Sequence, residues 1–256
     1  MQKSEILTTE TPGLKSIFSQ RFRVPVVQKA EFAATMKEKT MNAYIWTLRI
    51  IGFVMGAFIL MITLPGLLNR TGEFFPGGFK LRGLALEWVK KPDEAIKIID
   101  THAARLLKDL KLDSQIVVPL YVFYYIALAW YLKIQGGTRD IFLASAITIG
   151  ILIAGLYDLR ENAFTSKVIN NFNNSGRLDI TNLEQKYWAC YIKWSLIALV
   201  ILLIGVMLIT QGNSLTGMIN LLAAIIFLAG FIGSKSITEW GFAAMGIGLL
   251  FIAFSL

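Results

Sequence analysis

Two acids and an amide lie one helical turn apart in the middle of the chain, in the run Asp158-Leu-Arg-Glu161-Asn162. This spacing puts Asp158, Glu161 and Asn162 on one face of a helix. An apolar stretch of membrane-spanning character, 140–158, ends at this motif. Ionisable groups at membrane depth are costly, so they are candidates for function. Two such carboxylates could act as acid and base in moving protons.

Two further charged residues, Asp113 and Lys193, are expected at the same depth. With a rise of about 1.5 Å per residue, Asp158 lies about 28 Å along a helix from Arg139. Asp113 and Lys193 lie about 30 Å and 26 Å from the opposite ends of their own apolar stretches. The hydrocarbon core is about 30 Å thick, so all three groups reach one membrane boundary. We predict a network of Asp113, Asp158, Glu161, Asn162 and Lys193.

This network has two interpretations. In the structural one, Asp158 and Lys193 pair at headgroup level and close two spans against each other. In the functional one, Asp158 and Glu161 are the catalytic candidates, and Lys193 holds an anionic lipid headgroup. The residue types allow both interpretations.

The elements that would position these residues are long apolar helices. The chain is 55% hydrophobic and 16% charged, against roughly 25% charged in soluble domains. Stretches long enough to cross a bilayer, about 20 residues each, lie near 43–67, 115–133, 140–158, 189–210, 215–233 and 239–256. The predicted fold is an all-α polytopic membrane bundle with about six transmembrane helices over 43–256. A polar N-terminal arm, 1–42, precedes it.

One polar segment between the first two spans has the pattern of an amphipathic helix. Over 93–111, apolar residues that include Ile99 and Leu106 recur at spacings of three and four, with basic residues on the other faces. Such a helix is too charged to insert and apolar enough to lie on a membrane or bundle surface. We predict one surface helix here.

Composition narrows the possible cofactors and partners. Cys190 is the only cysteine and His102 the only histidine, so no clustered set of such ligands for a metal or haem is available. We predict no metal and no cofactor. The net charge of +8 is spread over polar segments, as in membrane proteins that face anionic lipid. The predicted partners are the lipid bilayer and other membrane-protein subunits, not nucleic acid.

The chain also resembles a loose set of uncharacterised bacterial multipass membrane proteins with an Asp-x-x-Glu-Asn motif. The resembling residues within 93–200 are Asp113, Tyr121, the Asp158–Asn162 motif and Lys193. This resemblance implies a multipass membrane protein and brings no activity with it.

We therefore expect an integral membrane protein, in a bacterial inner or another energy-transducing membrane, without a recognisable catalytic motif. The first functional interpretation is an accessory, assembly or scaffold component of a membrane complex, with no enzymatic activity. The alternative is handling of a lipid or small apolar ligand, by transfer or by acid–base chemistry at Asp158 and Glu161. An ion-coupled transporter is the third.

Overall fold

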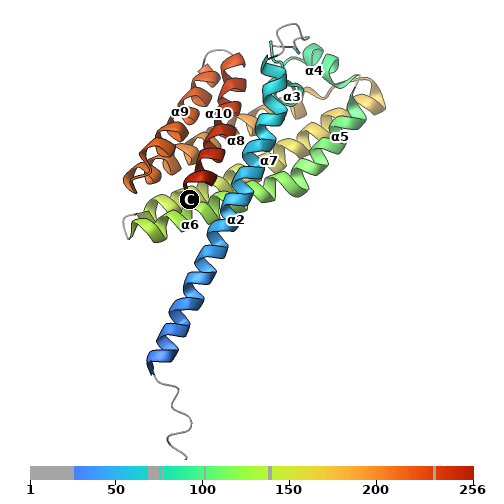
Figure 1. The fold of residues 1–256 in the computed structure, drawn as a ribbon. Helices are drawn as coiled ribbons and strands as arrows, with labels where there is room; N and C mark the ends of the chain where they lie inside the picture. Colours follow the sequence, from blue (N-terminus) through green and yellow to red (C-terminus); the bar gives the residue numbers. More distant parts are fainter. Residues whose placement is uncertain (1–25, 69–74, 77, 101, 138–139, 233–234) are drawn as a thin grey trace, which may run out of the picture. The chain divides into compact units, whose positions relative to one another are not determined.

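The computed structural model describes residues 26–68, 75–76, 78–100, 102–137, 140–232 and 235–256. In these ranges the chain is all-helical (Figure 1), which confirms the predicted class. The helices are α2 (Val26–Leu68), α3 (Arg82–Trp88), α4 (Pro92–Ile99), α5 (Ala103–Leu112), the π-helix η1 (Asp113–Val117), α6 (Val118–Gly136), α7 (Asp140–Ser175), α8 (Ile180–Thr210), α9 (Ser214–Ile232) and α10 (Lys235–Ser255). The first 25 residues of the predicted arm lie outside the described residues.

Contacts divide the chain into two units, Met1–Trp46 and Thr47–Leu256. In the first unit the described residues are helical, and the side chains of 34–40 are exposed. The candidate site lies wholly in the second unit.

Five helical stretches are long and apolar enough to cross a membrane: Ala34–Leu68, Ala103–Gly136, Asp140–Ser175, Ile180–Thr210 and Ile237–Ser255. They fit an integral membrane protein with several crossings. The prediction of six spans is not confirmed, because the sixth apolar stretch, Ser214–Gly230, is shorter than the other five.

The predicted single surface helix over 93–111 is not confirmed either. The segment forms two helices, because α4 ends at Ile99 and α5 begins at Ala103. The His102 N–H donates to the Ile99 carbonyl across the break, at 2.9 Å. Aspartate and histidine are weak helix formers, and Asp100 and His102 stand at this position. Ile99 and Leu106 are nevertheless buried, as their place in the apolar stripe predicts.

The helix α5 does not stop at the polar run that begins with Asp113, but continues through η1 into α6. In η1 the Val118 N–H donates to the Asp113 carbonyl, five residues back. Pro119 follows directly; it has no N–H, and its ring presses on the carbonyl of Gln115, four residues earlier. A wider π-turn before the proline accommodates both effects and keeps the helix continuous.

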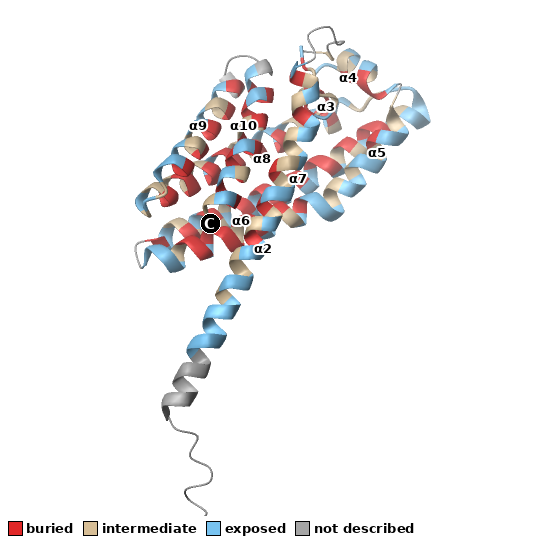
Figure 2. Cartoon of the chain, in the orientation of Figure 1, coloured by how far each residue is buried: buried red, intermediate tan, exposed pale blue. Residues whose placement is uncertain are grey.

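The helices from α6 to α10 pack in chain order, each against the next. The largest contacts join α7 to α8, α9 to α10, α8 to α9 and α6 to α7. Figure 2 shows the buried positions, in red, along the facing sides of these helices. On α7 the buried row is made of Ala144, Ile147, Ile151 and Ala154, one residue per turn. Beyond this row and the buried Gly155, the next buried residues on the same helix are polar: Asp158, Glu161, Asn162 and Thr165.

Candidate functional site: a buried charged cluster

An ammonium group on α8 lies at the centre of the site. The Nζ atom of Lys193 lies 2.6 Å from Glu161 Oε2, 3.2 Å from Asp158 Oδ1 and 3.4 Å from Glu87 Oε2. The side chains of Lys193 and Glu161 are 4% and 2% exposed. These four residues are called the charged cluster below. It joins three helices, because Glu87 lies on α3, Asp158 and Glu161 on α7, and Lys193 on α8.

Asp158 has a partner for each of its carboxylate oxygens. Oδ1 accepts from Lys193, and Oδ2 accepts a hydrogen bond from the Tyr121 hydroxyl on α6 at 2.9 Å. Gly155, one turn before Asp158, lies against this part of α6: a Cβ there would approach the Val122 side chain to 2.7 Å. The close approach of α6 and α7 is what brings Tyr121 within reach.

Asn162 and Asp113, the remaining predicted residues, form a second polar contact beside the charged cluster. The Asn162 side-chain amide donates to Asp113 Oδ2 at 2.7 Å and to the Ser114 hydroxyl at 3.1 Å. Both acceptors belong to η1, so this contact holds the π-turn against α7. Asn162 follows Glu161 directly in the chain, and this places the contact next to the charged cluster. The structure thus brings all five predicted residues together, as two adjoining groups.

The sequence-based prediction missed Glu87. Besides Lys193, its Oε2 atom accepts a 2.6 Å hydrogen bond from the Trp194 indole N–H and lies 3.8 Å from the Cys190 sulfur. Glu87 lies in the long connection between the first two spans, where no apolar period fixes a depth. A usable signal was present on α8, because Lys186, Cys190 and Lys193 share one face at helical spacing. Buried lysines on such a face require acceptors from other elements, as carboxylates or as backbone carbonyls.

Two polar clamps hold α3 in the position that Glu87 needs. At its first end, one carboxylate oxygen of the buried Glu239, on α10, accepts from the backbone N–H groups of Lys80 and Leu81, each at 2.7 Å. At its last end, the Lys186 ammonium donates to the carbonyls of Leu86 and Val89, the latter at 3.2 Å. Helix ends carry backbone groups without helical partners, and these two side chains bind such groups. Glu87 is therefore positioned from both α8 and α10.

Glu87, Glu161 and Cys190 could in principle surround a metal ion. One ligand atom from each lies within 4.8 Å of the other two. The Lys193 ammonium, however, lies 2.6 Å from Glu161 Oε2 and 3.4 Å from Glu87 Oε2. It therefore occupies the position in which a cation would meet these oxygens. The same crowding argues against Lys193 as the holder of an anionic headgroup, because three carboxylates already surround its charge.

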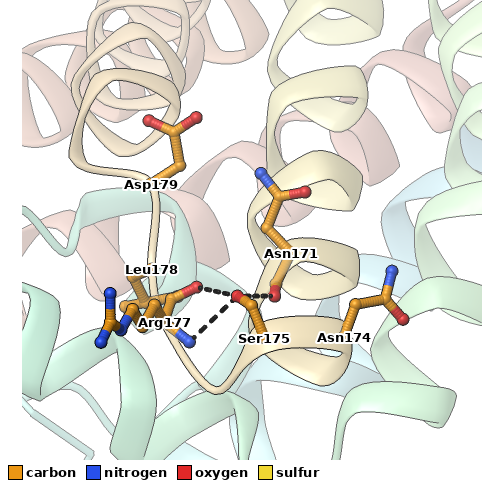
Figure 3. Close-up of a pocket in the computed structure, with 6 residues that line it drawn as sticks. All are labelled: Asn171, Asn174, Ser175, Arg177, Leu178 and Asp179. Atoms are coloured by element: carbon orange, nitrogen blue, oxygen red, sulfur yellow. Dashed lines mark hydrogen bonds between the residues drawn. The ribbon is translucent and has the colours of Figure 1, made fainter.

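Two surface hollows lie elsewhere in the described chain. One, of about 250 Å³, is at the turn from α7 to α8 and is lined by Asn171, Asn174, Ser175, Arg177, Leu178 and Asp179 (Figure 3). Side chains of this hollow bind nearby backbone groups. The Ser175 hydroxyl donates to the Asn171 carbonyl, and Asp179 caps α8 by accepting from the Asn182 N–H. The other, of about 490 Å³, lies where α6, α8 and α10 end and includes Gln211, which donates to Asp140. Neither lining includes a member of the charged cluster.

Comparison with protein-family models, with curated proteins and with solved structures found no match for this chain. The described fold and site therefore define the class on their own: an all-helical, multipass integral membrane protein with a buried charged cluster at the junction of α3, α7 and α8.

Proposed function

We propose that this chain is a non-catalytic component of a membrane complex, serving as an accessory, assembly or scaffold subunit. One observation carries the proposal: the groups that could do chemistry are buried and paired with one another. Asp158 and Glu161 both bind Lys193, at 3.2 Å and 2.6 Å. An acid and a base that are held in this way are poorly placed to meet a substrate, but they are well placed to tie helices together.

The proposal includes six crossings of the bilayer. The helix α9 has 19 residues, a length of about 28 Å at a rise of about 1.5 Å per residue. This is close to the thickness of a hydrocarbon core, about 30 Å. The turn from α8 to α9 is short, because α8 ends at Thr210 and α9 begins at Ser214.

Isolation from native membranes in a mild detergent tests the subunit role. The expected result is that other membrane proteins purify with this chain in a fixed ratio. That ratio should be kept in Tyr125→Phe, a variant outside the charged cluster, and should fall in Lys193→Met, which disturbs the helix junction. A chain that purifies alone, with lipid as its only companion, would contradict the proposal.

The second candidate is acid–base handling of a lipid or small apolar ligand, with Asp158 and Glu161 as the reacting groups. It is favoured by the excess of carboxylates at the site. Glu87, Asp113, Asp158 and Glu161 supply four carboxylates, while Lys186 and Lys193 supply two ammonium groups. Two of these carboxylates, Asp158 and Glu161, are buried. Excess negative charge beside buried carboxylates is costly, and bound protons relieve it.

This candidate has its own test. Vesicles of native lipid that contain either the wild-type protein or Asp158→Asn are incubated, and their lipids are compared by mass spectrometry. A lipid product that forms with the wild type and is absent with Asp158→Asn supports acid–base handling. Identical lipid profiles contradict it.

A further inference from the structure

Four aromatic side chains form a continuous surface beside the charged cluster. Trp88, at the end of α3, packs edge-to-face on two tyrosines of α8, with ring centroids 6.2 Å from Tyr187 and 6.5 Å from Tyr191. Trp188 packs edge-to-face on the same two rings, at 5.8 Å and 6.0 Å. Trp188 is 59% exposed and Tyr191 38% exposed, so the surface faces outward.

A lysine completes this surface. The Nζ atom of Lys90 lies 3.8 Å from the centroid of the Tyr187 ring. The neighbouring Lys91 pairs with Glu94 at 3.5 Å, whereas the contact that the described structure shows for the Lys90 ammonium is the ring. Because an aromatic face attracts a cation, the ring holds an exposed positive charge at the edge of the aromatic surface.

The distance along α8 from this aromatic surface to the C-terminal end of the helix is about the thickness of the hydrocarbon core of a bilayer. Tyr191 is 19 residues before Thr210, about 28 Å along the helix, and the core is about 30 Å thick. Tryptophan and tyrosine are enriched at this level in membrane proteins, since their rings are apolar and their N–H and O–H groups are polar.

We infer that Lys90, Trp88, Tyr187, Trp188 and Tyr191 form a docking surface for the phosphate-bearing headgroups of an anionic bilayer. The inference rests on the membrane location and is independent of the proposed subunit role. A quaternary ammonium headgroup fits the surface less well, because the Lys90 ammonium already lies on the face of Tyr187. The lysine instead offers its charge to a phosphate, while the exposed rings insert among the headgroups.

The test uses the full chain in vesicles of phosphatidylcholine to which phosphatidylglycerol is added. Each lipid in turn carries a nitroxide at the top of its acyl chain, and quenching of tryptophan fluorescence is measured. The part of the quenching that is lost in Trp188→Phe reports on this surface. Nitroxide-labelled phosphatidylglycerol should quench the Trp188 fluorescence at a lower mole fraction than nitroxide-labelled phosphatidylcholine does.

Lys90→Gln should reduce this preference about fivefold, the effect expected for one basic residue at an anionic surface. Lys97→Gln, which changes an exposed lysine of α4, should leave the preference unchanged. The inference is overturned if Trp188→Phe removes no quenching, because the rings are then covered by something other than lipid. It is also overturned if Lys90→Gln and Lys97→Gln give the same preference.

Discussion

At the scale of single residues, Lys193 has the most demanding position in the chain. Removing its ammonium group from water costs several kcal/mol, and the Coulomb attraction of neighbouring carboxylates offsets that cost when the geometry is good. The ring of Trp194, 4.6 Å from Nζ, adds a further weak attraction. Each carboxylate of the charged cluster contacts the same ammonium, so one side chain contributes to the junction of three helices.

Tyr121→Phe tests the hydrogen bond from the Tyr121 hydroxyl to Asp158 of the charged cluster. It removes the hydroxyl that donates to Asp158 Oδ2 at 2.9 Å, and leaves a buried carboxylate oxygen without that donor. The expected loss of unfolding free energy is about 1–3 kcal/mol, measured by thermal unfolding in detergent. Tyr125→Phe is the matched control, because it removes a hydroxyl one turn further along α6 that does not bind Asp158. Equal losses in the two variants would show that the bond to Asp158 contributes nothing.

At the scale of elements, η1 and α3 depend on side chains from other helices. A π-turn is a rare conformation, and this one is held by Asn162, which donates to Asp113 and Ser114. We expect Asn162→Ala to speed amide hydrogen exchange over 113–117. Asn170→Ala, which changes an exposed amide of α7, should leave exchange in this segment at the wild-type rate. Exchange that is unaffected by Asn162→Ala would contradict a role of this contact in holding η1.

The short helix α3 has only seven residues and cannot be stable alone. Glu239→Ala removes the acceptor of the Lys80 and Leu81 N–H groups. The start of α3 should therefore loosen, and trypsin should cut faster at Lys80 and Arg82. Glu184→Ala, at an exposed position of α8, is the control and should keep the wild-type cleavage rate. Unchanged cleavage in Glu239→Ala would mean that the clamp does not hold α3.

Much of the helix layout and part of the site follow from local patterns in the sequence. Apolar length predicts the long helices, and the spacing of Asp158 and Glu161 with the depth of Lys193 identifies residues that the structure brings together. Glu87 does not follow from such patterns, because its position depends on contacts made by Lys186 and Glu239, which are about 100 and 152 residues away in sequence. The continuity of α5 with α6 does not follow from the sequence pattern for another reason. The polar residues that begin with Asp113 predict a helix boundary, and the pattern does not indicate the π-turn before Pro119 that keeps the helix continuous.

At the scale of the whole molecule, the order of crossings can be measured directly. Cys190 is buried and is the only cysteine, so Cys190→Ala gives a background for single cysteines. A six-span layout places Gln135→Cys and Ser214→Cys on one side, and Asn174→Cys and Ile237→Cys on the other. An impermeant maleimide added to sealed vesicles should label the first pair and the second pair from opposite sides. If Ile237→Cys is labelled together with Ser214→Cys, α9 does not cross.

The central claim, that the charged cluster ties the bundle together, is tested most directly by unfolding two variants. Lys193→Met alone leaves the buried carboxylates of Asp158 and Glu161, and the part-exposed one of Glu87, without their ammonium. It should lower the unfolding free energy by about 3–5 kcal/mol. Adding Asp158→Asn and Glu161→Gln removes the two buried stranded charges and leaves only Glu87, which is part-exposed and keeps the Trp194 N–H. The triple variant should therefore regain most of that loss and should still purify with its partners. A triple variant as unstable as Lys193→Met would contradict the claim, and so would one that folds normally but no longer assembles.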